Sequence, residues 1–286
     1  MSELLFGVLG PVVACRGSVA VRLPSGKRRL VLAVLLLHAD DRVDREQIID
    51  VVWGDRPPPS AVNLVQKYVG EVRRALGLDS RTLESVGHGY LLRVSPEQLD
   101  SGRFVRLLAE AVQRRVVGDQ AGARLGLGEA SALWRGPAFS GIETADAVTE
   151  RARLDEYRVR AWEELAELDL SRGENVPAIA ELSRLAAEHP FRERVRELHM
   201  IALYRGGRHA EALAVFQDVR RLLAEELGAD PGPRLRMVHE QILRADPALD
   251  SAGELPQPVL SPVCQLPSDI PTSPAASPSS TACSRP

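Results

Sequence analysis

An internal repeat of 34 residues is the feature that most constrains this fold. "GENVPAIAEL" begins at Gly173 and "GRHAEALAVF" begins at Gly207, and in both segments an alanine follows the glycine five residues later. Gly118 begins a fainter copy with the same glycine-to-alanine spacing. Glycine suits the turn between two helices, and alanine allows two helices to approach closely. The repeat therefore predicts helix pairs that stack on one another.

A period of 34 residues is that of tetratricopeptide repeats, which are pairs of antiparallel helices. The pattern is helical throughout residues 96–245 (the body), so we expect an all-α, tetratricopeptide-like helical repeat domain there. Residues 246–286 hold nine of the 20 prolines, mixed with serine and alanine and few large apolar residues. Such a composition cannot form a core, so a disordered tail is predicted.

Residues 1–95 (the head) have a different pattern. Short β-rich runs within 4–23 predict a small antiparallel sheet, and helices are expected at about 27–39, from Asp44 onward, and at 61–76. "RTLESVGHGYLLRV" then predicts a hairpin around a Gly-His-Gly turn. A sheet, three helices and a hairpin are typical of a winged helix-turn-helix. The predicted fold class is thus mainly α with a small β part, with domains at 1–95, 96–245 and 246–286.

The helix at 61–76 could read DNA. On a helical wheel Val65, Val69, Val72 and Leu76 form an apolar stripe, widened by Tyr68. The opposite face carries side chains that bind adenine, guanine or phosphate, with a glycine among them: Asn63, Gln66, Lys67, Gly70, Arg73 and Arg74. A merely solvated helix would look similar, but the proline loop before it and the hairpin after it favour DNA binding.

Glu71 lies on the shoulder of that polar face. It could pair with Lys67 and Arg74 on its own helix, or it could accept a hydrogen bond from a cytosine amino group. We favour the pairing. His88, between two glycines, is interpreted as a turn residue or a phosphate contact rather than a catalytic group.

The chain contains no G-x-x-x-x-G-K-[ST], H-E-x-x-H or G-x-S-x-G motif. Its three cysteines, Cys15, Cys264 and Cys283, show no metal-ligand spacing. We therefore expect no cofactor, no metal and no enzyme activity. The apolar run "LVLAVLLL" is too short to span a bilayer, so a cytoplasmic, nucleoid-associated protein without a membrane partner is expected. The head carries 13 Lys and Arg against 10 Asp and Glu, which points weakly to an anionic partner.

Taken together, several strings resemble the Streptomyces antibiotic regulatory protein family. They include "FGVLGP", "VWGDRPP", "VRRALG", "GHGYLLRV", "LWRGPAF" and "ELGADPGPRL", and the resemblance covers roughly residues 4–245. These actinobacterial proteins join an OmpR-type winged helix to a bacterial transcriptional activation domain. The resemblance implies an activator of antibiotic or other secondary-metabolite gene clusters. Such an activator binds direct repeats in double-stranded DNA near a promoter, as a homodimer or side-by-side protomers, and recruits RNA polymerase.

The resemblance also assigns residues. It implies that the wing around Gly87–Tyr90 touches flanking DNA, which adds Tyr90 to His88 as a DNA contact. It places a polymerase-contacting loop at Gly54, Asp55, Arg56, Pro57, Pro58 and Pro59. Gly70 and Glu71 stand where the family commonly has Ser-Arg, so the arginine contact is carried over to Arg73 and Arg74 and not to Glu71. The alternative is a helical-repeat adaptor for other proteins, with a head that does not bind DNA.

Overall fold

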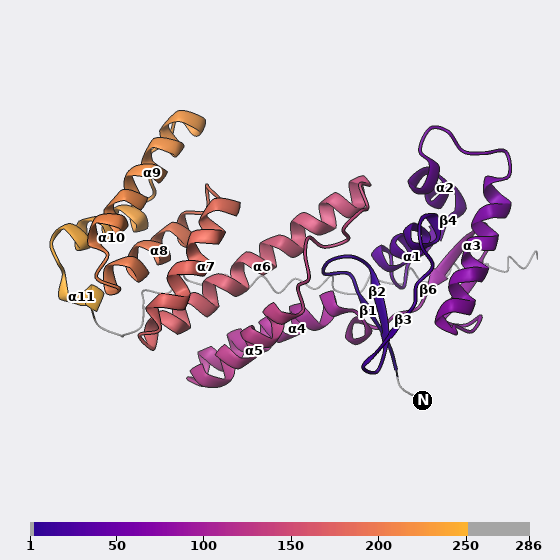
Figure 1. Cartoon of the computed structure of the whole chain (residues 1–286), viewed down its shortest axis with the longest axis horizontal. Helices are drawn as coiled ribbons and strands as arrows, with labels where there is room; N and C mark the ends of the chain where they lie inside the picture. The colour runs from indigo at the N-terminus through magenta and orange to yellow at the C-terminus, as the bar shows by residue number, and fades with distance from the viewer. Residues whose placement is uncertain (1–2, 251–286) are drawn as a thin grey trace, which may run out of the picture. The chain divides into compact units, whose positions relative to one another are not determined.

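The computed structural model describes residues 3–250. It is mainly helical with two small antiparallel sheets, as predicted (Figure 1). The head begins with a sheet in the order β1-β2-β3, formed by Leu4–Gly7, Val13–Arg16 and Val19–Val21. Its helices are α1 (Lys27–Leu37), α2 (Arg45–Trp53) and α3 (Ala61–Leu76). A hairpin of β5 (Leu83–Val86) and β6 (Gly89–Leu92) follows, so the predicted winged helix is confirmed.

Local sequence explains the helix ends. Asp44 and Gln47 form a capping box at the start of α2, where the sequence predicted a helix from Asp44 onward. Gly77 adopts the left-handed conformation that ends α3, with φ of 63°. Ser60 precedes α3, but its side chain makes no capping hydrogen bond. The six consecutive residues from Val31 to Leu36 are all buried, because α1 packs against both α2 and α3.

One strand was not predicted. Residues Arg42–Asp44 form β4, which pairs antiparallel with β6 and makes the second sheet three-stranded, in the order β4-β6-β5. Gly89 is required at this pairing, since a Cβ there would lie 2.3 Å from the carbonyl oxygen of Val43. The wing is therefore anchored to the segment that leads into α2.

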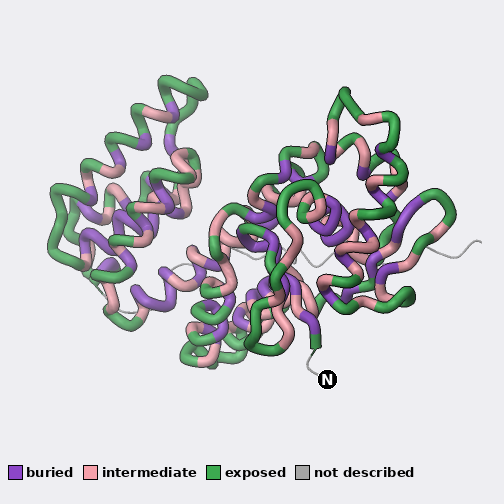
Figure 2. The backbone as a smooth tube through the Cα atoms, turned by 45° about the vertical axis from the view of Figure 1, so that its right-hand side comes forward, coloured by how far each residue is buried: buried purple, intermediate pink, exposed green. Residues whose placement is uncertain are grey.

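The body is all helical after a short 3₁₀ turn at Pro96–Gln98. Its helices are α4 (Asp100–Val116), α5 (Gln120–Ala132), α6 (Ala145–Ser171), α7 (Asn175–Glu188), α8 (Glu193–Arg205), α9 (His209–Leu227) and α10 (Pro233–Leu243). From α6 to α10 each helix packs on the next, and α8 also packs on α6 and α10. Buried and exposed stretches alternate along these helices (Figure 2).

The predicted repeat is confirmed in the body. Gly118, Gly173 and Gly207 have φ of 84°, 78° and 74°, a left-handed conformation that strains other residues. They precede α5, α7 and α9, the first helices of three successive pairs. The alanine five residues after each glycine is buried, as close helix packing requires.

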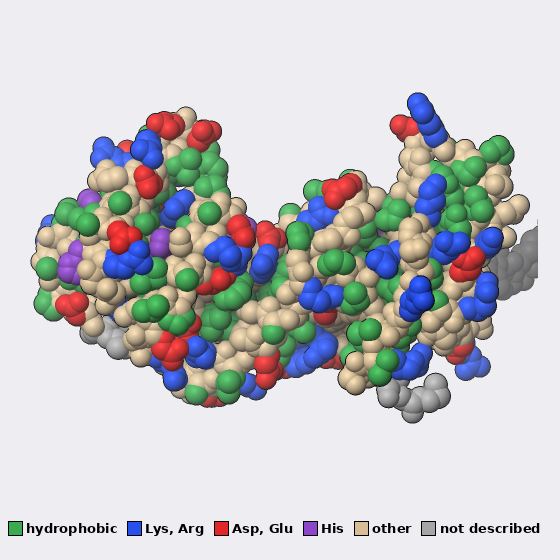
Figure 3. All heavy atoms as spheres, in the orientation of Figure 1, with side chains coloured by type: hydrophobic (Ala, Val, Ile, Leu, Met, Phe, Trp, Pro, Cys, Tyr) green, Lys and Arg blue, Asp and Glu red, His purple; other side chains and the backbone are tan. Residues whose placement is uncertain are grey.

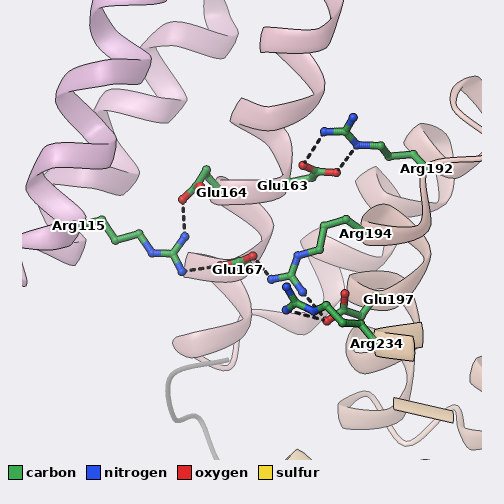
Figure 4. Close-up of polar contacts among 8 residues, drawn as sticks. All are labelled: Arg115, Glu163, Glu164, Glu167, Arg192, Arg194, Glu197 and Arg234. Atoms are coloured by element: carbon green, nitrogen blue, oxygen red, sulfur yellow. Dashed lines mark hydrogen bonds and ion pairs between the residues drawn. The ribbon is translucent and has the colours of Figure 1, made fainter. Parts of the chain in front are cut away.

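A chain of ion pairs, the ion ladder, crosses the body from α4 through α6 to α8 and α10 (Figure 4). It joins Glu164, Arg115, Glu167, Arg194, Glu197 and Arg234, in that order. A separate pair, Glu163 with Arg192, lies beside it. Glu167 on α6 is central, because it accepts from Arg115 on one side and Arg194 on the other. Both guanidinium groups are largely buried, so each needs its carboxylate partners.

The disordered tail predicted from residue 246 is wrong for its first residues, because Pro247–Asp250 form a short helix, α11, with Leu249 buried and its carbonyl oxygen bound by Arg205. The rest of the predicted tail lies outside the described residues. In the part of the chain that the structure describes, no helix has the length and apolar character needed to cross a bilayer.

Candidate nucleic-acid interface

The predicted division of α3 into two faces is present. Val65, Val69, Val72 and Leu76 are buried in the core, while Asn63, Gln66, Lys67 and Arg74 are exposed. Gly70 borders open space, since a Cβ added there would meet no atom within 4 Å. The fold therefore presents a strip of polar and basic side chains along α3 that is accessible to a partner.

Glu71 is not paired as expected. It neither pairs with Lys67 nor with Arg74, but accepts a hydrogen bond from Nε of Arg28 in α1. This corrects the predicted pairing within α3. The helical wheel placed Glu71 on the shoulder of the face, and that shoulder turns out to lie against the N-terminal end of α1.

Arg28 belongs to a stack of cations and rings that ties the three helices together. Its guanidinium lies 5.5 Å from the centre of the Tyr68 ring. Tyr68 stacks on Trp53 at 6.0 Å with an interplanar angle of 16°, and Nζ of Lys27 lies 4.8 Å from the Trp53 ring. Because Trp53 is the last residue of α2, this stack fixes where the loop 54–60 begins.

Arg73 has a role that the sequence did not predict. Its Nε and Nη2 donate to the carbonyl oxygen of Leu83 at 3.0 and 2.6 Å, and Nη2 also donates to Oγ of Ser85 at 3.2 Å. The guanidinium thus connects α3 to β5 of the wing. With these donors directed at the wing, Arg73 is placed to orient the hairpin, a role beside the DNA contact that stays a prediction for it; Arg74 is exposed.

The wing exposes one of its two predicted contacts. Gly87 has φ of 57° and His88 is exposed at the tip of the hairpin. Tyr90 is only 2% exposed, and the guanidinium of Arg45 lies 5.8 Å from its ring centre. Its assignment as a DNA contact is wrong, because pairing of β6 with β4 turns residues 90 and 92 toward the core.

The predicted polymerase-contacting loop is accessible. Gly54, with φ of 58°, ends α2, and the residues from Asp55 to Pro57 are exposed. The carbonyl oxygen of Pro58 accepts from the amide of Ala61 at 2.9 Å, which fixes the loop where it enters α3. In Figure 3 basic side chains are more prominent than acidic ones over the part of the head that holds α3.

Two further arginines, Arg22 and Arg29, line with Arg28 a cavity of about 700 Å³ beside Glu71, between β2, β3 and α1. Only their clustering in the segment 22–29 could have indicated them from sequence. Residues 3–250 contain no cluster of three or more His, Cys, Asp or Glu side chains that could hold a metal ion.

A winged helix with an accessible polar strip, followed by a helical-repeat body, defines a class of bacterial transcriptional regulators. Residues 99–243 match the family described as "Bacterial transcriptional activator domain", and residues 20–92 match the one described as "Transcriptional regulatory protein, C terminal". The chain belongs to the Streptomyces antibiotic regulatory protein family, as the sequence resemblance indicated.

Relatives extend over most of the chain. It is 42% identical over 271 residues to "Regulatory protein AfsR" of Streptomyces griseus, covering 94% of this chain but 28% of that protein. It is 36% identical over 256 residues to "Regulatory protein DnrI" of Streptomyces peucetius, covering 86% and 94%. The structure "Mycobacterium tuberculosis EmbR in complex with low affinity phosphopeptide" matches with a TM-score of 0.77 and 32% identity, over 88% of this chain and 68% of that one. The chain thus spans about a quarter of the AfsR proteins and nearly all of DnrI.

Proposed function

We propose that this chain is a sequence-specific, DNA-binding transcriptional activator, specific for an antibiotic or other secondary-metabolite gene cluster. The accessible polar strip of α3 carries the proposal, together with membership in a family of transcriptional regulators. In this proposal the head is residues 1–95 and the body is residues 96–245.

The strip of α3 would enter the major groove. Asn63 and Gln66 carry amides that suit adenine, and Lys67 and Arg74 carry cations that suit guanine or phosphate. Gly70 leaves room for a close approach to the groove. His88 at the tip of the wing would reach the flanking backbone, where Arg73 holds the hairpin in place.

The protomers would bind direct repeats near the promoter side by side, and the loop 54–59 would contact RNA polymerase at the nucleoid. The exposure of Asp55, Arg56 and Pro57 supports a contact there. The Trp53–Tyr68 stack also supports it, because it ties the start of the loop to α3 and therefore to the DNA.

Footprinting on the promoters that neighbour this gene tests the proposal. We expect protected direct repeats whose occupancy falls as salt rises from about 50 to 200 mM, because bound cations release counterions from DNA. Arg74→Ala should weaken this protection, whereas Arg221→Ala, at an exposed arginine on α9, should not. Absence of a protected repeat at every salt concentration would overturn the proposal.

Transcription from the same promoter with purified polymerase tests the loop separately. Arg56→Ala is expected to leave the footprint intact and to lower activated transcription. If Arg74→Ala retained full promoter activation, the adaptor alternative, in which the head does not bind DNA, would be favoured instead.

A further inference from the structure

Two of the family-resembling strings, "FGVLGP" in the head and "LWRGPAF" in the body, have no part in the proposed DNA contact. The structure brings them together. The backbone of Val8–Gly10, just after β1, lies between the start of α4 and the connection from α5 to α6.

Asp100, the first residue of α4, holds this segment from one side. Its Oδ1 accepts from the amide of Val8 at 2.7 Å, and both carboxylate oxygens accept from the amide of Leu9 at 3.2 Å. The residue is 8% exposed. A buried carboxylate needs such donors, because its desolvation is otherwise costly.

Arg135 holds the same segment from the other side. Its Nη2 donates to Oδ2 of Asp100 at 2.6 Å, and its backbone amide donates to the carbonyl oxygen of Leu9 at 2.8 Å. The carbonyl oxygens of Val8 and Gly10 accept from the amides of Phe139 and Ser140 at 2.8 and 3.3 Å. Every carbonyl from Val8 to Gly10 is therefore bound by the body.

The fit is close on both sides. A Cβ on Gly7 would lie 2.3 Å from Nη2 of Arg135 and 2.7 Å from Cγ2 of Val13. Phe139 has φ of 51°, which strains a bulky residue. Arg151 holds it there by donating to the carbonyl oxygens of Ala138 and Ile142 at 2.9 and 2.7 Å. Strain of this kind persists only where the surrounding contacts impose it.

The apolar core continues through this contact. One cluster of buried side chains runs from Leu4 and Phe6 of the head to Phe104, Leu127 and Leu154 of the body. A second polar contact, between His38 at the end of α1 and Asp146 in α6, spans 3.4 Å. Head and body are thus joined by more than the short connection at residues 93–99.

We propose that Asp100 and Arg135, with Val8–Gly10, form a rigid clamp that transmits the position of the DNA-bound head to the activating body. Asp100 and Arg135 are positioning residues for activation and do not contact DNA. This inference rests on the proposed function. It predicts that DNA affinity and activation of transcription can be changed separately. Breaking the clamp alters the position of the body at the promoter but leaves the α3 strip intact.

The test compares Asp100→Asn and Arg135→Gln with the wild-type chain. Asp100→Asn keeps the volume of the side chain and removes its charge. Arg135→Gln alters a side chain that is about one-third exposed and is the milder change for folding. Asp218→Asn, which removes an exposed carboxylate paired with Arg221 on α9, is the matched control.

Two quantities are measured on the footprinted promoter: the affinity of the full chain, and activated transcription at saturating protein. We expect affinity within about twofold of wild type, since the hydrogen-bond partners of Asp100 and Arg135 lie in Val8–Pro11 and not on α3. We expect activation to fall about fivefold or more. Hydrogen exchange at the amides of Val8 and Leu9 should become faster in both variants and not in the control.

Activation at saturation equal to wild type in both variants would overturn the clamp, as would a loss of affinity as large as the loss of activation. If the wild-type chain binds and activates, and both variants activate equally well, only the clamp is contradicted and the proposed function stands. A wild-type chain that protects no repeat overturns the proposed function and this inference with it.

Discussion

Glu71 of α3 is held by Arg28 of α1, 43 residues earlier in the chain. The carboxylate is thereby directed toward α1 and away from Lys67 and Arg74, and Arg28 in turn lies over Tyr68. An acidic residue on α3 is thus compatible with the proposed DNA binding, because its charge is neutralised from within the head.

Glu71→Gln should therefore strengthen binding to all DNA without changing the preferred sequence. The substitution removes a negative charge near the strip and releases Arg28. The pair is partly exposed, so the free energy of unfolding should fall by less than about 1 kcal/mol. Affinities for the operator and for unrelated DNA are the measurement, and Glu110→Gln on α4 controls for net charge. Loss of preference at one base pair would instead support cytosine recognition by Glu71.

Arg73 and Arg74 are adjacent but should differ in their salt response. Arg74→Ala should lower affinity for all sequences and reduce the slope of log affinity against log salt by about one, as expected for a lost phosphate contact. Arg73→Ala should keep that slope and lose protection at the flank touched by the wing, because its donors bind Leu83 and Ser85. Footprints at several salt concentrations distinguish the two. Equal slope changes in both variants would show that Arg73 also contacts phosphate.

Glu167→Ala should strongly destabilise the body. It leaves the largely buried guanidinium groups of Arg115 and Arg194 without a shared partner, and breaking a buried ion pair costs about 3–5 kcal/mol. Urea denaturation gives the change in the free energy of unfolding. Glu188→Ala, at an exposed ion pair with Arg184, should cost less than about 1 kcal/mol. If the two variants lost similar amounts of unfolding free energy, the ion ladder would stabilise the body no more than an exposed ion pair does.

His199 on α8 should make stability depend on pH. Burial, helped by the charges of Arg196 and Arg208 and opposed by Glu211, lowers the pKa of His199 from 6.5 to about 4. The unfolded chain therefore binds a proton between these values that the folded chain does not. Keeping His199 neutral therefore adds to the free energy of unfolding only at higher pH. This stabilisation is complete above pH 6.5 and is lost as the pH falls toward 4, by up to about 3 kcal/mol.

His199→Gln provides the comparison, since it cannot titrate. Denaturation curves of both proteins between pH 4.5 and 7.5 should show the wild type losing more stability than the variant as the pH falls. Parallel curves over this range would contradict the assigned pKa.

Local patterns predicted the elements of this fold because helices and turns depend on neighbouring residues. The apolar stripe of α3 follows from a period of 3.6 residues. The capping box at Asp44 and the turns at Gly118, Gly173 and Gly207 follow from spacings of a few residues. The sequence by itself therefore determined the winged helix, the helical repeat and the exposed strip.

The partners of particular side chains were decided only by the tertiary structure. Tyr90 is buried because β4 pairs with β6, Arg73 turns to the wing, and Glu71 meets Arg28. Asp100 and Arg135 likewise reach a segment about 90 or more residues away in the chain. A helical or strand period sets which face a residue lies on. The packing of distant segments decides what it meets there, and nothing in the local sequence carries that information.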